Sequence, residues 1–221
     1  MERRTKIVAT LGPGTSKEET IGNLVHFGVD VTRLNFSHGE HETHLKNARS
    51  VREAAEKSGR NVAVMQDIQG PKIRIGEVVG ETELVEGNRV TVAPGDFLGD
   101  ASRLSTPYKQ VVQDVEPGHR ILLDDGLLEI RVEEVEDSEI ECVVVTGGPI
   151  SSHKGMNFPD SSLSISGLTP KDLEDLRFGV EELRPDWIAA SFVRSGDEVE
   201  EIKERISEFG GSGIPLISKV E

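Results

Sequence analysis

Hydrophobic positions in the first third of the chain follow two alternating periods. Three short apolar runs rich in β-branched residues predict strands, at residues 5–11, 29–36 and 61–67. Apolar residues at helical spacing between them predict two helices. One begins with a capping box formed by Ser16 and Glu19, and the other runs from about residue 40 to residue 59. Connections this short between strands and helices imply parallel strands joined by right-handed crossovers.

The pattern changes at Gly70 and returns after Gly155. Between these glycines there is no helical periodicity, only short strands and turns, with a hairpin predicted to turn at Asp125 and Gly126. Helical periodicity then resumes: Thr169 is predicted to cap a helix that starts at Pro170, because proline suits a first helical turn. Two further strands are predicted, at residues 186–192 and 215–221.

This pattern predicts a β/α scaffold interrupted by an all-β insert. We assign residues 1–72 and 155–221 to the scaffold and residues 73–154 to the insert. The scaffold then has five strands in about 140 residues, whereas a closed (β/α)8 TIM barrel has eight strands in roughly 250. The predicted fold class is therefore α/β, a TIM barrel with five strands present and three missing.

Charge is distributed unevenly along the chain. The net charge is −15, and residues 75–153 carry 17 acidic and 5 basic side chains, a net of −12. Such a surface disfavours nucleic-acid binding, which needs Lys and Arg to neutralise phosphates. It favours solubility, and the break in composition supports a separate module.

Several features favour a cytoplasmic protein that does not enter a membrane. No apolar run approaches the roughly 20 residues needed to cross a bilayer. The charged N-terminus lacks the apolar segment of a signal peptide. Cys142 is the only cysteine, so an intrachain disulfide is excluded.

Polar residues at predicted strand ends are candidates for chemistry. Alternation along a strand puts Arg33, Asn35 and Ser37 on one face, at the end where α/β barrels place their active sites. Lys219 and Glu221 share a face in the same way; they suit a transferring phosphoryl group and a divalent cation, or form a structural ion pair.

Asp67 and three histidines are further candidates, and each also has a purely structural interpretation. Asp67 ends the third strand, where it binds a cation, caps a helix or forms a salt bridge. The spacing of His38, His41 and His44 gives at most one neighbouring pair, so we predict that His41 and His44 are solvated surface residues. The chain has no Walker phosphate loop, G-x-G-x-x-G motif or zinc-ligand spacing.

Seven segments together resemble the pyruvate kinase family, in family order and at family-like spacing across the whole chain. They are residues 6–13 (KIVATLGP), 31–39 (VTRLNFSHG), 67–74 (DIQGPKIR), 124–127 (DDGL), 154–159 (KGMNFP), 190–194 (ASFVR) and 217–221 (ISKVE). The resemblance implies a barrel with a mobile β-domain inserted after strand three. It also implies glycolytic phosphoryl transfer from phosphoenolpyruvate to ADP, giving pyruvate and ATP, in a homotetramer.

The resemblance also implies a role for each candidate residue. Arg33 and Lys219 would bind the transferring group and stabilise the transition state, and Glu221 would be one of two carboxylates on Mg²⁺ or Mn²⁺. A potassium ion would be bound by Asn35, Ser37, Asp67 and the carbonyl of Ile68. The nucleotide would be bound by Asn35, Ser37, His38, Arg74 and Lys154.

Two departures from the family pattern matter. Many members have Glu where this chain has Lys72, and Lys at this position accompanies potassium-independent activity. The second metal carboxylate, three barrel strands and the C-terminal domain of the family would follow residue 221, which predicts that this chain alone is inactive. Another phosphoenolpyruvate- or pyruvate-handling barrel enzyme, or a non-catalytic binding module, is the alternative.

Overall fold

The computed structural model describes residues 4–220, which form two compact units. The first unit comprises residues up to 71 together with those from 166 onward, and the second comprises residues 72–165. The predicted insert ended at Lys154, whereas the structure places this boundary after Ile165. The reason is that Leu163 and Ile165 pack against the core of the second unit.

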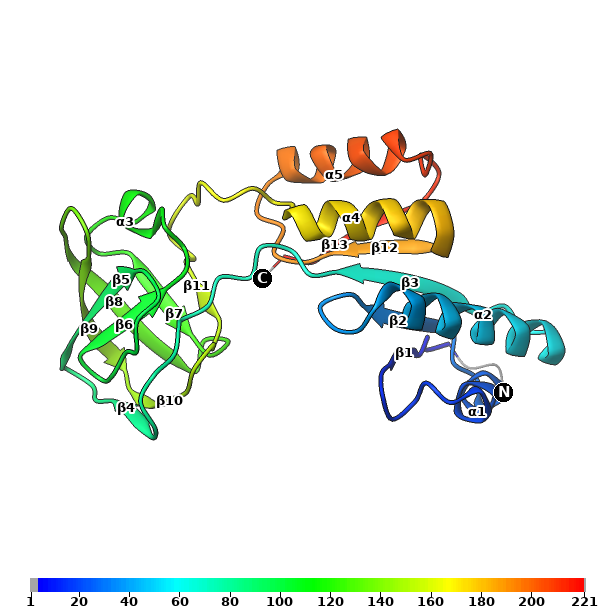
Figure 1. Cartoon of the computed structure of the whole chain (residues 1–221), viewed down its shortest axis with the longest axis horizontal. Coiled ribbons are helices and arrows are strands. Elements are labelled where there is room, and N and C mark those ends of the chain that lie inside the picture. Colours follow the sequence, from blue (N-terminus) through cyan, green and yellow to red (C-terminus); the bar gives the residue numbers. More distant parts are fainter. Residues whose placement is uncertain (1–3, 221) are drawn as a thin grey trace. The chain divides into compact units, whose positions relative to one another are not determined.

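The first unit is a curled parallel sheet with helices packed on its outer face (Figure 1). Its strands, in spatial order, are β1 (Val8–Leu11), β2 (Val31–Asn35), β3 (Ala63–Ile68), β12 (Trp187–Ala190) and β13 (Leu216–Ser218). Its helices are α1 (Glu18–Phe27), α2 (His41–Ser58), α4 (Pro170–Phe178) and α5 (Gly196–Glu208), with a π-helical turn at Gly179–Leu183. The predicted α/β arrangement with parallel strands is confirmed. Within residues 4–220, no helix combines the length and the apolar character needed to span a membrane.

The two faces of this sheet differ in composition because side chains alternate along each strand. Leu34 and Ile68 point outward and are 0% and 1% exposed beneath the helices; burying side chains of this size contributes about 1.5–3 kcal/mol each. Val31, Met65 and Ala189 form a smaller apolar cluster on the inner face. Arg33 and Asp67 follow at the next inward positions along β2 and β3, so the carboxyl ends of the strands carry the polar residues.

The second unit is mainly β-structure around its own core. Six strands form one sheet, in the order β11 (Met156–Asn157), β7 (Arg120–Leu123), β8 (Leu128–Val135), β9 (Ile140–Thr146), β5 (Arg89–Pro94) and β6 (Arg103–Thr106). A separate pair consists of β4 (Thr82–Leu84) and β10 (Gly148–Ile150). The predicted hairpin joins β7 and β8, and Asp125 and Gly126 both have positive φ. The unit also contains a short helix, α3 (Val111–Asp114), which the all-β prediction missed because one turn shows no periodicity.

The two predicted helix caps had different outcomes. Thr169 caps α4 as predicted, because its Oγ1 accepts from Asp172 N while Asp172 Oδ2 accepts from Thr169 N. The capping box at Ser16 is wrong: α1 begins at Glu18, and the Ser16 hydroxyl donates to the carbonyl of Gly12 at 2.8 Å. The hydroxyl therefore closes the turn after β1 instead of capping the helix.

Gly179 permits a close contact between the π-helical turn and the sheet. A Cβ atom here would overlap Oε1 of Gln66, a fully buried side chain whose Nε2 donates to Asp175 O at 2.7 Å. Gly179→Ala should therefore destabilise the intact protein by roughly 1–3 kcal/mol, measured as a lower Tm. The matched control is Gly22→Ala in α1, where nothing lies within 4 Å of the added Cβ and stability should rise by about 1 kcal/mol. Equal effects of the two substitutions would contradict this account.

Candidate functional site

Three charged side chains meet on the inner face, at the carboxyl ends of the strands. Arg33 Nε lies 2.5 Å from Asp67 Oδ2, and Lys219 Nζ lies 2.8 Å from Asp67 Oδ1. The Asp67 side chain is 2% exposed, whereas those of Arg33 and Lys219 are 28% and 31% exposed. A buried carboxylate is costly unless it is paired, and here two cations pair it.

Several neighbouring strands position this cluster. Asn35 on β2, Asp67 on β3 and Ala189 on β12 are in register. Lys219 follows β13, and its N–H donates to Ala190 O at 2.9 Å, which extends the pairing past the last strand residue. Arg33 also donates from Nη1 to Thr10 Oγ1 on β1 at 3.1 Å.

The cluster carries a net charge of +1, because two cations surround one carboxylate. Arg33 and Lys219 remain partly exposed, so their unused donors can contact a ligand at the surface. A positive site at the carboxyl ends of parallel strands suits an anionic group such as a phosphate or carboxylate.

The predicted potassium ligands already have partners. Asn35 Oδ1 accepts from Ser37 N at 3.2 Å, and the carbonyl of Ile68 accepts from Ser191 Oγ at 2.8 Å. Asp67 contacts both cations described above. Each of these oxygens keeps a lone pair beyond the contact described, so the contacts do not decide the site and the potassium assignment stays a prediction. Sequence reasoning gave Ser191 no role, although it directly follows β12.

The predicted divalent-metal site is not established by the described residues. Glu221 lies outside them, and among residues 4–220 no three His, Cys, Asp or Glu side chains gather as a metal site.

The histidine prediction was wrong for His44. This residue is 5% exposed, stacks on Phe36 with ring centroids 4.2 Å apart, and its Nε2 lies 2.9 Å from His38 O. Burial lowers the pKa of His44. His41 is 41% exposed in its side chain but pairs with the buried Asp175, so it is not simply a solvated residue either.

The predicted nucleotide residues Arg74 and Lys154 lie together in the second unit. The N–H of Ile75 donates to Lys154 O at 2.9 Å, which joins the two segments that carry Arg74 and Lys154. Arg74 Nη1 donates to His153 O at 2.9 Å, and Lys154 Nζ lies 2.8 Å from Asp124 Oδ1. Lys72 also belongs to this unit, where its Nζ lies 3.9 Å from Asp125 Oδ1. The remaining nucleotide candidates, Asn35, Ser37 and His38, belong to the first unit.

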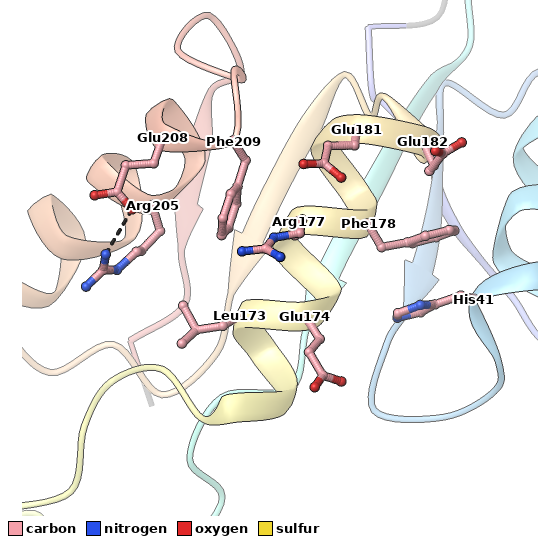
Figure 2. Close-up of a pocket in the computed structure, with 10 residues that line it drawn as sticks. All are labelled: His41, Leu173, Glu174, Arg177, Phe178, Glu181, Glu182, Arg205, Glu208 and Phe209. Carbon is pink, nitrogen blue, oxygen red and sulfur yellow. Dashed lines mark hydrogen bonds and ion pairs between the residues drawn. The ribbon is translucent and has the colours of Figure 1, made fainter.

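A cavity of about 500 Å³ lies among helices α2, α4 and α5 (Figure 2). His41 stacks on Phe178 with centroids 4.1 Å apart, and the Arg177 guanidinium lies 5.1 Å from the centre of the Phe209 ring. Its lining contains none of the residues of the Arg33–Asp67–Lys219 cluster. The cavity is on the helical side of the sheet, so it is separate from the cluster.

Comparisons with known proteins agree with the motifs. The family model described as pyruvate kinase, barrel domain, matches residues 2–221. A pyruvate kinase of Corynebacterium glutamicum is 45% identical over all of this chain and 46% of its own length. Corresponding values are 42% and 47% for Mycobacterium tuberculosis, and 39% and 38% for Geobacillus stearothermophilus. The chain therefore spans less than half the length of these curated relatives.

The family match covers nearly every residue, and it includes Arg33, Asp67 and Lys219. The motif resemblance is thus confirmed by an independent comparison. This chain belongs to the pyruvate kinase family.

Proposed function

We propose that this chain forms part of an enzyme that transfers the phosphoryl group of phosphoenolpyruvate to ADP, giving pyruvate and ATP. The observation that carries this proposal is the pair of cations held on buried Asp67 by Arg33 and Lys219. In this reading the curled sheet is five strands of a TIM barrel, and the second unit is a β-domain inserted after the third strand. The proposed enzyme is a cytoplasmic homotetramer.

Phosphoryl transfer depends mainly on positioning and on neutralising charge. Arg33 is fixed by Asp67 and Thr10, so its remaining donors can orient the phosphoryl group. Lys219 is fixed through Asp67 and bears its charge on a flexible stem, which suits a group whose charge shifts during transfer. Asp67 then acts as a positioning residue for both cations.

By the family resemblance, Glu221 would hold Mg²⁺ or Mn²⁺ together with a second carboxylate. Such an ion neutralises phosphate charge when bound. Because the described residues do not supply this site, the role of Glu221 rests on the family resemblance.

The second unit is proposed to act as a lid over the nucleotide. Two of its segments, joined by the bond from Ile75 N to Lys154 O, carry Arg74 and Lys154, which are suited to contact phosphates, while the rest of the unit is strongly acidic. The proposed nucleotide site also includes Asn35, Ser37 and His38. Deleting the insert from the complete enzyme would abolish transfer on this reading.

The test of this function uses the enzyme completed to the length of its relatives. Pyruvate formation from phosphoenolpyruvate and ADP is measured in a coupled assay. Arg33→Leu should reduce kcat/KM by at least about a hundredfold, because a donor to the reacting group is lost. Arg205→Leu is the control, since Arg205 pairs with Glu208 on the exposed helix α5 and should retain activity.

Absence of pyruvate formation by the wild type would reject the proposal. Activity with phosphoenolpyruvate but another acceptor would indicate a different phosphoenolpyruvate-handling enzyme. Binding of phosphoenolpyruvate without turnover would indicate a binding module.

The complete enzyme is also expected to work without potassium. Two cations already pair with Asp67, the one carboxylate among the candidate ligands, and Lys72 replaces the Glu of many family members. Activity with sodium or tetramethylammonium should match activity with potassium within about twofold. Lys72→Glu should introduce potassium dependence. Stimulation of the wild type by potassium of about tenfold, equal to about 1.4 kcal/mol, would contradict this prediction.

A further inference from the structure

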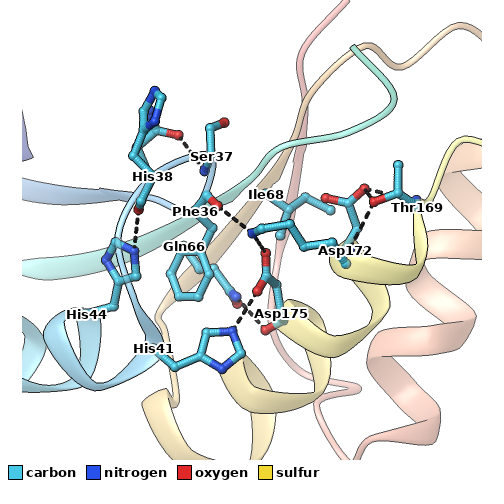
Figure 3. A network of polar contacts seen from close by, with 12 residues as sticks. Phe36, Ser37, His38, His41, His44, Gln66, Ile68, Thr169, Asp172 and Asp175 are labelled. Atoms are coloured by element: carbon cyan, nitrogen blue, oxygen red, sulfur yellow. Dashed lines mark hydrogen bonds and ion pairs between the residues drawn. The ribbon is translucent and has the colours of Figure 1, made fainter. Parts of the chain in front are cut away.

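A network of polar contacts around the buried carboxylate of Asp175 joins helix α4 to the segment that follows β2 (Figure 3). Lys171 Nζ lies 2.7 Å from the carbonyl oxygen of Phe36 and 2.6 Å from Asp175 Oδ2. The other carboxylate oxygen, Asp175 Oδ1, lies 2.6 Å from His41 Nε2. Asp175 is 2% exposed and the Lys171 side chain is 49% exposed, so the ammonium group at the surface links a backbone carbonyl to a buried carboxylate.

Phe36 lies between residues assigned to the active site. Its N–H donates to the carbonyl of Asp67 at 2.9 Å, and its buried ring stacks on His44. The next turn depends on Asn35, whose Oδ1 accepts from Ser37 N and whose carbonyl accepts from His38 N. Fixing the Phe36 carbonyl therefore fixes the backbone from which Asn35, Ser37 and His38 project.

The same part of α4 also holds the loop after β3. Asp172 is fully buried, and its Oδ1 accepts from Gly70 N at 3.0 Å. Gly70 has a φ of +68°, and a side chain there would overlap the carbonyl of Ser191, which limits the paths this loop can take. Two carboxylates on adjacent turns of α4 thus hold the two loops that flank Asp67.

Stability alone does not account for this arrangement. The Lys171 side chain is 49% exposed, and an ion pair with a solvent-exposed partner contributes little to stability. The network does fix geometry, because the ammonium group of Lys171 contacts both the carbonyl oxygen of Phe36 and the carboxylate of Asp175.

We propose that Lys171 and Asp175 are positioning residues for the segment 36–38 at the end of β2. Their effect on catalysis rests on the proposed function, whereas their effect on this segment does not. Small displacements of the groups that hold the phosphoryl acceptor in place lower the rate of transfer more than they weaken the binding of phosphoenolpyruvate. Loss of the Lys171 bond should therefore reduce kcat while leaving the KM for phosphoenolpyruvate nearly unchanged.

The test compares Lys171→Met, Lys171→Arg and Asp175→Asn in the complete enzyme. The matched control is Lys203→Met, which removes an exposed lysine paired with Glu200 on α5. Amide hydrogen exchange at residues 36–39 should be at least about tenfold faster in Lys171→Met and Asp175→Asn, and unchanged in the control. kcat should fall about 10- to 100-fold with KM within about threefold, and Lys171→Arg should restore part of both properties.

Unchanged exchange at residues 36–39 in a folded Lys171→Met or Asp175→Asn variant would overturn the proposal. So would faster exchange spread evenly over the whole first unit, because that would indicate a general loss of stability. If the wild type forms no pyruvate, the proposed function fails, yet the exchange comparison still decides whether Lys171 and Asp175 position the segment.

Discussion

Lys219→Met in the complete enzyme should lower turnover by at least about a thousandfold and change phosphoenolpyruvate binding only a few-fold. A cation aimed at charge that develops in the transition state contributes several kcal/mol there and less in the ground state. Arg33 remains on Asp67 in this variant, so the site keeps one cation to bind the substrate. Methionine also retains an unbranched side chain, which limits the change to the loss of charge.

The structure supplies controls for this measurement. Lys6→Met removes an exposed lysine that pairs with Asp30, just before β2, and should leave turnover unchanged. Lys219→Arg keeps the charge but replaces a compact ammonium group with a larger, planar guanidinium group. It should therefore recover only part of the wild-type turnover. If Lys219→Met and the wild type had equal turnover, Lys219 would not be a catalytic residue, and its role would be limited to pairing with Asp67.

Alternation along β2 could be read from the sequence because it depends on neighbouring residues only. Leu34 and Phe36 are buried as that pattern requires, while Arg33, Asn35 and Ser37 remain partly exposed. The strand-end position of Asp67 also followed from the local pattern. Asp67 also contacts Lys219, which lies 152 residues later in the chain. That contact depends on the curvature of the sheet, which the local hydrophobic pattern does not predict.

The contacts of α4 could not be predicted in this way. His41 and Asp175 are 134 residues apart in the chain, and periodicity identifies the apolar face of each helix but not how two helices align. A histidine at a helix start is usually a surface residue, so His44 was assigned to solvent. Its burial follows from the aromatic ring of Phe36, which covers it.

The insert boundary illustrates the same limit. Residues between Lys154 and Ile165 have few periodic apolar positions, and the sequence offered no reason to separate them from the scaffold. Met156 pairs with Leu123 across β11 and β7, and Phe158 is buried in the same core. The segment therefore belongs to the second unit through contacts that are distant in sequence.

The polypeptide of these 221 residues, purified alone, should show no pyruvate kinase turnover above background. It should also elute from a size-exclusion column ahead of a 24.1 kDa monomer. In the described residues, β1 and β13 each pair with one strand only, so both edges of the sheet present unpaired backbone groups. Apolar side chains on or next to these edge strands are exposed, including Val8 at 53% on β1 and Val220 at 82% after β13. Open edges beside apolar surface favour association.

The matched control is a polypeptide of residues 72–165 alone. This unit has its own core, and its buried Cys142 reports whether that core is intact. Burial, with a smaller effect of Glu141, raises the pKa of the Cys142 thiol to about 12, so the thiolate that reacts with alkylating agents is scarce in the folded state. The isolated unit should be monomeric, and its thiol should react at pH 8 only after denaturant is added. A monodisperse, active monomer of the 221-residue polypeptide would contradict this prediction. It would mean that five strands are enough to enclose the active site, and that the exposed sheet edges prevent neither folding nor catalysis.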